Sequence, residues 1–352
     1  MSENQSILLI QTAFIGDVVL TTPMIRALRR CRPGAHIAVL VKPEARDFVE
    51  ALEEIDEVLV IDKKKAHKGM GMLRLISDIR KRKFSILLSP HQSHRTSLIA
   101  FLSGIPVRFG YKSAGFSLAY GHRLKRPMDL PEIHRLLKFL KDSICPELDM
   151  EDDIPHLEET EMGRAQAQQL LTELNVRKPV LLGCSSVWET KRWTPHGFAE
   201  LARDLIKKYK TDVLLIGSPA DSEVAEQIVR LAREFLGDDG LRRLHNACGK
   251  TSLPGLFSLM KRSLFLVSND SAPVHFGCAA GIPVVAIFGP TVPSLGYAPI
   301  APRTAVAELP DLYCRPCGTH GARKCPEGHF RCMRDLTPAM VEEKIIAVMD
   351  DA

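Results

Sequence analysis

Short apolar runs alternate with amphipathic stretches along most of this sequence. Residues 7–10, 179–184 and 284–288 are apolar runs of the length expected for buried strands. Between such runs, stretches such as 72–82 place their large apolar residues at helical spacing. Strands that alternate with helices predict mostly parallel sheets with helices on both faces, which is the α/β class.

Residues 145–161 interrupt this alternation. The stretch is acidic, contains two prolines and has no hydrophobic periodicity, as is typical of a linker. A chain of 352 residues is long enough for two domains of ordinary size. We therefore expect two doubly wound domains, 1–160 and 161–336, followed by an amphipathic terminal helix at about 337–350.

The composition of the chain mainly excludes some classes of protein. The chain is 45% hydrophobic and 25% charged, and it contains no run of about 18 apolar residues that could form a transmembrane helix. Its N-terminus has no basic region before the first strand, so we expect no signal peptide and a cytoplasmic protein. In that compartment the nine cysteines are expected to be thiols or metal ligands rather than structural disulfides.

Charge is unevenly distributed between the two halves. Residues 1–145 carry 24 Lys and Arg against 14 Asp and Glu, whereas the remainder carries 23 against 28. A basic first half suggests an anionic partner such as a phosphorylated lipid, a membrane surface, an acidic sugar or nucleic acid. Aromatic residues make up only 6% of the chain and do not interleave with the basic residues, which argues against nucleic acid.

The segment 264–291 combines a strand, a polar turn, a short helix and a second strand. Such a unit directs backbone N–H groups and a helix N-terminus at one point, which suits an anion such as a pyrophosphate. An ordinary βαβ unit explains the same pattern. Asp270 and His275 favour a ligand site, because the turn needs only one capping residue.

Other candidate residues follow the ends of predicted strands, where open α/β sheets bind ligands. Asp17 follows the first strand and is either a general base or a helix cap. Lys191 lies in a loop flanked by both Trp residues of the chain and is either a phosphate clamp or part of a packed surface loop. Asp221 and Glu223 open a helix and suit either ribose hydroxyls or a capping box.

Basic and polar side chains of the first half either contact an anionic substrate or form solvated surface. The candidates are Lys63, Lys64, His91, Arg95, Lys112 and Arg123.

Four cysteines fall within nineteen residues near the C-terminus: Cys314, Cys317, Cys325 and Cys332. With His320 and His329 they could bind zinc, although the spacing C-x2-C-x7-C-x6-C does not match the usual zinc motifs. A structural knot of thiols and turns is the alternative.

Three motifs carry a family resemblance that spans nearly the whole chain. They are IGDVVLTTPMIRALRRCRPGAHIAVLV at 15–41, NDSAPVHFGCAAGIPVVAIFGPT at 269–291 and CPEGHFRCM at 325–333. The sequence resembles the bacterial heptosyltransferases of glycosyltransferase family 9, and most of all their heptosyltransferase II branch.

The resemblance implies a GT-B architecture, in which two Rossmann-like domains face each other across a cleft. It implies that the first domain binds the acceptor, that the second binds the nucleotide sugar, and that the terminal helix packs back on the first. The implied donor is ADP-heptose, and the implied acceptor is the Kdo- and heptose-containing inner core on lipid A. The implied reaction inverts the anomeric carbon without a metal at the pyrophosphate and without a cofactor.

The resemblance also assigns roles to individual residues. It makes Asp17 the catalytic base and Lys191 the cation that pairs with the phosphates. The remaining donor-site residues that it implies are Asp270, His275, Ser271 and Ala272, with Asp221 or Glu223 near the ribose. One departure is that Ser271-Ala272 stands where the family often has Thr-Gly, so that the backbone at 272 has less conformational freedom.

We therefore expect a monomeric, peripheral enzyme at the inner face of the inner membrane, without a nucleic-acid partner. Three alternatives stay open at this point. A nucleotide-dependent oxidoreductase would share the fold, but the first strand is not followed by G-x-G-x-x-G. A family-9 transferase for another sugar and a non-catalytic nucleotide or lipopolysaccharide binder are the other two.

Overall fold

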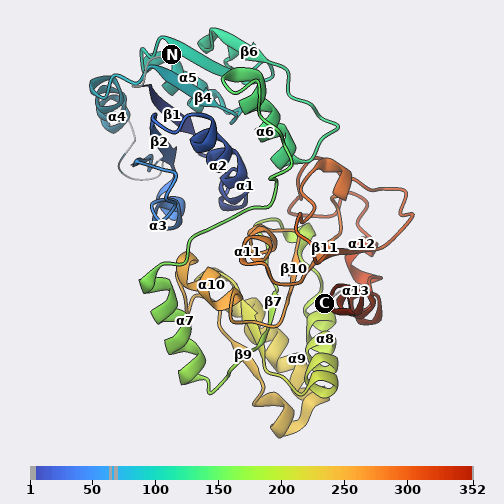
Figure 1. The fold of residues 1–352 in the computed structure, drawn as a ribbon. Coiled ribbons are helices and arrows are strands. Elements are labelled where there is room, and N and C mark those ends of the chain that lie inside the picture. The colour runs from blue at the N-terminus through green and yellow to red at the C-terminus, as the bar shows by residue number, and fades with distance from the viewer. Residues whose placement is uncertain (1–4, 63–65, 67–69, 351–352) are drawn as a thin grey trace. The chain divides into compact units, whose positions relative to one another are not determined.

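The computed structural model describes residues 5–62, 66 and 70–350. The chain forms two compact units, Met1–Glu158 and Glu159–Ala352 (Figure 1). Each unit contains one six-stranded sheet, and all strand pairs in both sheets are parallel.

The sheet of the first unit has the strand order β3-β2-β1-β4-β5-β6. Its strands are β1 (Ser6–Ile10), β2 (His36–Val41), β3 (Glu57–Val60), β4 (Ile86–Ser89), β5 (Val107–Tyr111) and β6 (His122–Leu124). Its α-helices are α1 (Ile15–Leu20), α2 (Thr22–Cys31), α3 (Arg46–Val49), α4 (Met70–Lys81), α5 (His94–Leu102) and α6 (Glu132–Ser143), with 3-10 helices η1 (Pro43–Ala45) and η2 (Ser117–Ala119).

The sheet of the second unit has the order β12-β11-β10-β7-β8-β9. Its strands are β7 (Val180–Gly183), β8 (Val213–Ile216), β9 (Leu244–Asn246), β10 (Leu266–Asn269), β11 (Val284–Phe288) and β12 (Thr304–Glu308). Its α-helices are α7 (Glu161–Glu173), α8 (Pro195–Tyr209), α9 (Ser222–Leu241), α10 (Leu253–Met260), α11 (Ala272–Ala280), α12 (Arg331–Arg334) and α13 (Pro338–Asp350), with 3-10 helices η3 (Glu189–Lys191), η4 (Pro219–Asp221) and η5 (Pro293–Leu295).

The central strands are apolar along their whole length because both of their faces are buried. Ile7–Ile10 of β1 and all residues of β7, β10 and β11 are buried. This is the pattern of parallel sheets that are covered by helices on both sides. The α/β class expected from the alternation of apolar runs and helices is confirmed.

The two sheets share one topology. Counted from the first strand of its own unit, each sheet follows the order 3-2-1-4-5-6, which is that of a dinucleotide-type doubly wound fold. The strand order reverses between β1 and β4 in the first unit and between β7 and β10 in the second. Ligands of open α/β sheets bind outside the carboxyl ends of the strands at such a reversal, so each unit presents one candidate position.

The terminal helix α13 packs within the second unit, against β11, β12 and α8. Val341, Ile345 and Val348 line its buried face and join the hydrophobic core around Trp193. This corrects the expectation that the helix packs back on the first domain, because its apolar face is covered by the second unit.

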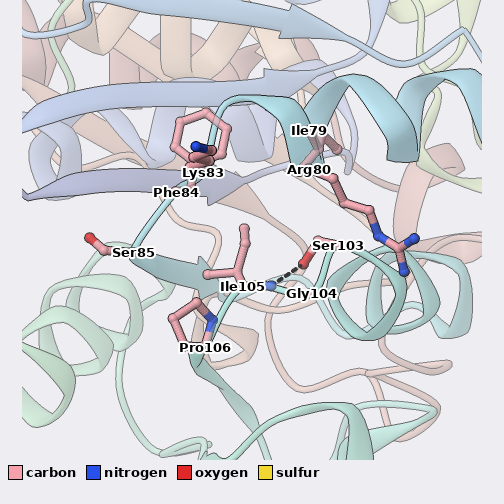
Figure 2. A pocket seen from close by; sticks show the side chains of 9 residues that line it. All are labelled: Ile79, Arg80, Lys83, Phe84, Ser85, Ser103, Gly104, Ile105 and Pro106. Carbon is pink, nitrogen blue, oxygen red and sulfur yellow. Dashed lines mark hydrogen bonds between the residues drawn. The ribbon is translucent and has the colours of Figure 1, made fainter.

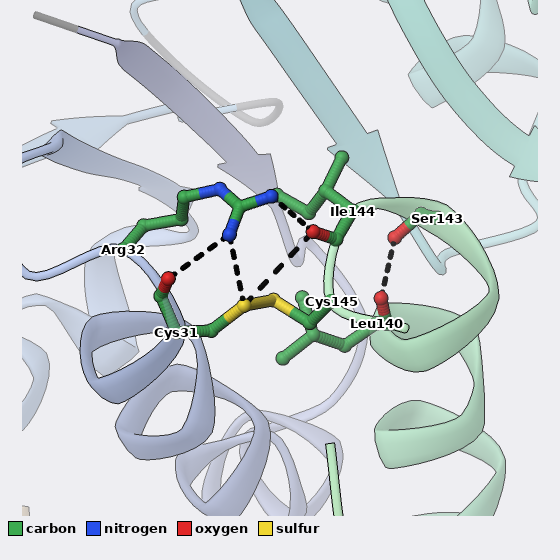
Figure 3. The surroundings of a disulfide bond; sticks show 6 residues. All are labelled: Cys31, Arg32, Leu140, Ser143, Ile144 and Cys145. Carbon is green, nitrogen blue, oxygen red and sulfur yellow. Dashed lines mark hydrogen bonds between the residues drawn. A yellow bond between two sulfur atoms is a disulfide. The ribbon is translucent and has the colours of Figure 1, made fainter. Parts of the chain in front are cut away.

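The expectation that no cysteine forms a structural disulfide is also wrong. Cys31 at the end of α2 and Cys145 just after α6 form a disulfide, with their Cα atoms 6.1 Å apart (Figure 3). The sequence could not reveal it, because the two residues are 114 positions apart and meet only when α2 packs against α6. The other seven cysteines are free.

Among the described residues, no helix is both long and apolar enough to span a bilayer.

Candidate active site

The carboxylate of Asp270 is the centre of a buried polar cluster at the reversal point of the second sheet. Asp270 directly follows β10 and is only 7% exposed. Its Oδ2 atom accepts hydrogen bonds from the Lys191 ammonium group at 2.6 Å and from the Thr291 hydroxyl at 2.6 Å. Lys191 ends η3 in the loop after β7, and Thr291 lies three residues after β11. Three neighbouring strands therefore supply one charge-paired cluster.

The loop that carries Lys191 is held from outside by the cysteine-rich segment 314–332. The Thr190 hydroxyl donates to the Ala322 carbonyl at 3.0 Å and accepts from the Ala322 N–H at 2.7 Å. Gly321 lies so close that a Cβ atom there would come within 2.5 Å of Trp188 and 3.0 Å of Lys191. A side chain at 321 would displace the lysine loop, so this contact requires glycine.

The same segment supports the loop Gly289–Thr291 through Arg315. The guanidinium group of Arg315 donates to the carbonyls of Gly289 and Thr291, the latter at 2.8 Å, and forms an ion pair with Glu308. The N–H of Cys317 donates to the Pro290 carbonyl at 2.8 Å. The segment thus positions both partners of Asp270, a role that the sequence did not indicate.

The zinc interpretation of the cysteine-rich segment finds no support in this arrangement. Within the described ranges, no three His, Cys, Asp or Glu side chains are grouped as a metal site would require. The Cys314 thiol approaches His329 Nε2 at 3.9 Å, and the Cys317 thiol donates to the Cys314 carbonyl at 3.2 Å. These contacts are those of a segment held by thiols and turns, the alternative interpretation.

Ser271 and Ala272 form the N-terminus of α11 beside this cluster. Ser271 is the N-cap residue, and its hydroxyl donates to the Asn269 carbonyl at 3.1 Å instead of capping the helix. In the described part of the chain, the backbone N–H groups of Ser271 and Ala272 donate no hydrogen bond. Two N–H groups at the positive end of a nine-residue helix can therefore bind an anion.

His275 and Asn269 complete the buried wall of the cluster. His275 is 5% exposed, and burial lowers its pKa to about 4, so that the ring is neutral at pH 7. Its Nδ1 atom and the Nδ2 atom of Asn269 are buried without a partner among the described residues. Buried polar atoms are generally satisfied, so these two atoms fit a site that a ligand completes.

The two acidic candidates after β8 differ in their environment. Asp221 accepts hydrogen bonds from the Ser218 N–H at 2.8 Å, from the Ser218 hydroxyl at 2.7 Å and from the Ser185 hydroxyl. It therefore caps η4 and ties the loop after β7 to the loop after β8. Glu223 is exposed in the first turn of α9. Of the described residues, none forms a hydrogen bond or ion pair with the Glu223 carboxylate.

Asp17 lies near the reversal point of the first sheet, in α1, the first helix after β1. Its Oδ2 atom accepts the Phe14 N–H at 3.1 Å, so the predicted capping role is real. Burial, and next the negative charge of Glu132, raise the pKa of Asp17 to about 6. The Phe14 N–H and the cations Arg126 and Lys42 oppose that increase. A carboxylate with this pKa is ionised at pH 7 and yet basic enough to take a proton.

A buried ionic network near Asp17 was not anticipated from the sequence. The Glu132 carboxylate pairs with Arg126 and, at 3.2 Å, with Arg135. Arg126 lies over the ring of Tyr111 at 5.3 Å. The network packs α6 against the end of β5, and it brings both a negative and a positive charge close to Asp17.

The proposed acceptor residues have different surroundings. His91 follows β4 and joins a network of hydroxyls, in which its Nδ1 atom lies 3.1 Å from Thr12 and 2.9 Å from Thr96. Arg95, Lys112 and Arg123 are exposed, on α5, after β5 and on β6 respectively. Lys63 and Lys64 lie outside the described residues.

The sequence and the fold of this chain have counterparts among known proteins. Residues 72–327 match the family model described as glycosyltransferase family 9 (heptosyltransferase). The match covers well over half of the chain, and the protein belongs to this family. It is therefore a glycosyltransferase.

Individual relatives agree with the family assignment over the full length. Lipopolysaccharide heptosyltransferase 2 of Escherichia coli K12 is 25% identical over 97% of this chain and 98% of that protein. The family-9 glycosyltransferase structure from Veillonella parvula has a TM-score of 0.87 at 24% identity, covering 99% of this chain and 98% of that one. The structure of E. coli ADP-heptose lipopolysaccharide heptosyltransferase II has a TM-score of 0.80 at 21% identity, covering 99% of this chain and 100% of that one. The expected GT-B fold class is confirmed in its two Rossmann-like units.

Proposed function

We propose that this protein transfers L-glycero-D-manno-heptose from ADP-heptose to the Kdo- and heptose-containing inner core of lipid A, with inversion at the anomeric carbon and without a metal. The observation that carries the proposal is the Lys191–Asp270–Thr291 cluster beside the N-terminus of α11. It joins a fixed cation to a helix N-terminus at the position where doubly wound folds bind ligands.

The second unit would bind the diphosphate of the donor. Lysine carries three N–H donors, so Lys191 can keep its bond to Asp270 and still donate to a phosphate oxygen. The N–H groups of Ser271 and Ala272 would contact the same diphosphate, and His275 would add a neutral polar contact. Fixed charges and dipoles of this kind stabilise a departing diphosphate, the role that Mg²⁺ has in other transferases. Either Asp221 or Glu223 would contact the ribose; Glu223 has the less engaged carboxylate.

The first unit would bind the acceptor and supply the base. In the transfer step, the acceptor hydroxyl oxygen attacks the anomeric carbon while its proton passes to Asp17. The bond from that carbon to the ADP oxygen breaks, and its electron pair leaves with the diphosphate. His91, Arg95, Lys112 and Arg123, with Lys63 and Lys64, would contact the phosphates and carboxylates of the inner core.

The choice of substrates rests on the relatives. The E. coli protein and the solved E. coli structure are named for heptosyl transfer to lipopolysaccharide and, in the second case, for ADP-heptose. A lipid-anchored acceptor would place the enzyme at the inner face of the inner membrane as a peripheral protein. We further propose that it acts as a monomer and needs no cofactor.

Isothermal titration tests the donor assignment. ADP, ADP-heptose, UDP and NAD⁺ are titrated into the purified protein in the presence of EDTA. We expect ADP and ADP-heptose to bind and UDP to bind more weakly. Preferential binding of UDP would keep the family and reject the heptose donor, and binding of NAD⁺ alone would reject the transferase interpretation of the second unit. Loss of ADP binding in EDTA, with recovery on adding Mg²⁺, would reject metal independence.

The pKa of Asp17 gives a prediction for the pH profile. The group must be ionised to accept a proton, and its raised pKa means that it becomes protonated as the pH falls through about 6. We therefore expect kcat/KM to be level above pH 7 and to decrease about tenfold per pH unit well below pH 6, since kcat/KM reports the free enzyme. Initial rates with soluble acceptor between pH 5 and 8 test this, with tryptophan fluorescence as the control for folding. An acid limb near the ordinary aspartate pKa of about 4 would contradict the assignment.

A further inference from the structure

The stretch from Ile79 to Met128 has an unusual charge pattern. Its fifty residues contain ten Lys or Arg and no Asp or Glu. The stretch runs from the end of α4 through β4, α5, β5, η2 and β6. Three of these cations pair with acidic residues outside the stretch: Lys81 with Asp78, Arg82 with Glu57 and Arg126 with Glu132. Most protein surfaces mix both signs, whereas the other seven cations form no ion pair with a described residue.

Exposed apolar side chains occupy the middle of this stretch. Leu98 and Phe101 lie three residues apart on α5, and are therefore on one face of the helix; they are 47% and 50% exposed. Leu118 in η2 is 72% exposed. Helix η2 packs against α5, and just before η2 the ring of Phe116 forms an edge-to-face pair with Phe101, with ring centroids 5.7 Å apart. We call these four side chains the apolar ridge. Exposed apolar side chains that gather on two packed elements are typical of an interaction surface.

Cations stand at both ends of the ridge. Arg95 lies one turn before Leu98 at the start of α5. At the other end of the helix, Arg80 donates to the Leu102 carbonyl at 2.8 Å. Arg80 and Lys83 also border a cavity of about 590 Å³ whose walls include Phe84 and Ile105 (Figure 2). Apolar walls beside two cations suit a phosphate that is attached to an acyl chain.

We propose that the apolar ridge and its flanking cations dock the first unit on an anionic phospholipid bilayer. Lys and Arg side chains near such a surface are attracted to its negative charge, and the apolar side chains insert at the boundary between headgroups and acyl chains. A second copy of this chain is the weaker occupant, because it would bring the same cations together. The proposal deepens the proposed function and rests on it for the lipid-anchored acceptor.

The position of α5 links docking to the reaction. The helix starts just after the carboxyl end of β4, next to β1, where His91 contacts Thr12 in the loop that leads to Asp17. The helix then runs back along the sheet toward the amino ends of the strands. Its length is about 13 Å, because it has nine residues with a rise of 1.5 Å each. The helix therefore spans the sheet from its carboxyl edge, which carries Asp17, to its amino edge, where Arg80 and Lys83 lie. A bilayer along α5 would reach the carboxyl edge at the Arg95 end of the helix, where a lipid-anchored sugar would have to be presented.

Vesicle flotation tests the docking. We expect the full-length protein to bind phosphatidylethanolamine vesicles that contain phosphatidylglycerol at least about tenfold more tightly than phosphatidylcholine vesicles, and to lose this preference at high salt. The double variant F101D/L118D and the double variant R80Q/K83Q should each weaken that binding about tenfold or more. The control M162D changes an exposed apolar residue of the second unit and should bind like wild type. Melting curves check that every variant is folded.

An activity measurement separates docking from catalysis. With acceptor embedded in anionic vesicles, F101D/L118D should lose most of its turnover. With an acceptor freed of its acyl chains, the same variant should match wild type. If wild type fails on both the embedded and the soluble acceptor, the proposed function is wrong, while flotation still decides the docking surface.

Two outcomes would overturn the docking surface. One is unchanged vesicle binding by a folded F101D/L118D. The other concerns the oligomeric state measured by light scattering: wild type is a dimer, F101D/L118D is a monomer, and both bind vesicles equally well. That result would assign the ridge to contact with a second copy of the chain.

Discussion

Replacing Asp17 by asparagine is expected to lower kcat about 10²- to 10⁴-fold while the affinity for ADP stays unchanged. The substitution keeps the size of the side chain, and the amide oxygen can still accept the Phe14 N–H that caps α1. What it removes is the ability to take the acceptor proton. ADP would bind in the second unit, at a cluster of which Asp17 is not part, so titration with ADP should give the wild-type affinity.

The matched control for this variant is Asp47→Asn. Asp47 is another acidic residue in the first turn of a helix of the same unit, α3, but it is exposed. Its replacement should leave kcat within about twofold of wild type, as is usual for surface substitutions. Turnover by a folded Asp17→Asn enzyme close to the wild-type value would remove Asp17 from the role of base and direct the search to other groups near the acceptor hydroxyl.

The strands that were predicted are those in which burial on both faces dictates composition. The apolar run 284–288 corresponds to β11 without any shift. The apolar run 264–267 begins and ends two residues before β10, because the strand includes Ser268 and Asn269, two polar residues that are typical of turns but are fully buried here. Asn269 is tolerated there because its Oδ1 atom accepts the Trp193 N–H at 2.9 Å. From the sequence alone, a buried polar residue whose hydrogen bonds are made by a partner far along the chain looks the same as a turn residue.

Three of the four edge strands, β6, β9 and β12, were not predicted, for the opposite reason. In β6, His122 and Arg123 are exposed, and β9 and β12 also contain residues that are only partly buried. With one side open to solvent, such short strands carry no continuous apolar run. The helical stretch after β1 is divided into α1 and α2 at Thr21, a break that the sequence pattern did not indicate. Pro23 has no N–H to bond the Val19 carbonyl, which instead accepts the Thr22 hydroxyl at 2.8 Å.

The candidate site was predictable in its parts but not in its connections. Asp17, Lys191 and Asp270 were recognised because each follows an apolar strand, and the carboxyl ends of parallel strands gather where ligands bind. The sequence did not show that Thr291, 21 residues after Asp270, shares its carboxylate with Lys191. Nor did it show that Arg315 fixes the loop of Thr291, since an arginine in a segment rich in Pro, Gly and Cys suggests surface.

Replacing Lys191 by methionine is expected to weaken ADP binding roughly 10- to 150-fold, which corresponds to the loss of a hydrogen bond between charged groups. The change removes the cation that would contact the diphosphate and leaves the Asp270 carboxylate buried, with only Thr291 donating to it among the described residues. That remaining negative charge would repel the phosphates. The kcat value should fall as well, because the same cation would stabilise the leaving diphosphate.

The double variant K191M/D270N separates the two effects. If repulsion between the unpaired carboxylate and the phosphates contributes to the loss of affinity, the double variant should bind ADP more tightly than K191M. It should also melt at a higher temperature, because removing one partner of a buried ion pair destabilises a protein more than removing both partners. Lys207→Met, at an exposed lysine of α8, is the control for loss of one positive charge and should bind ADP like wild type. Wild-type ADP affinity in a folded K191M would exclude the clamp, whereas equal affinities of K191M and K191M/D270N would show that the loss comes from the missing cation alone.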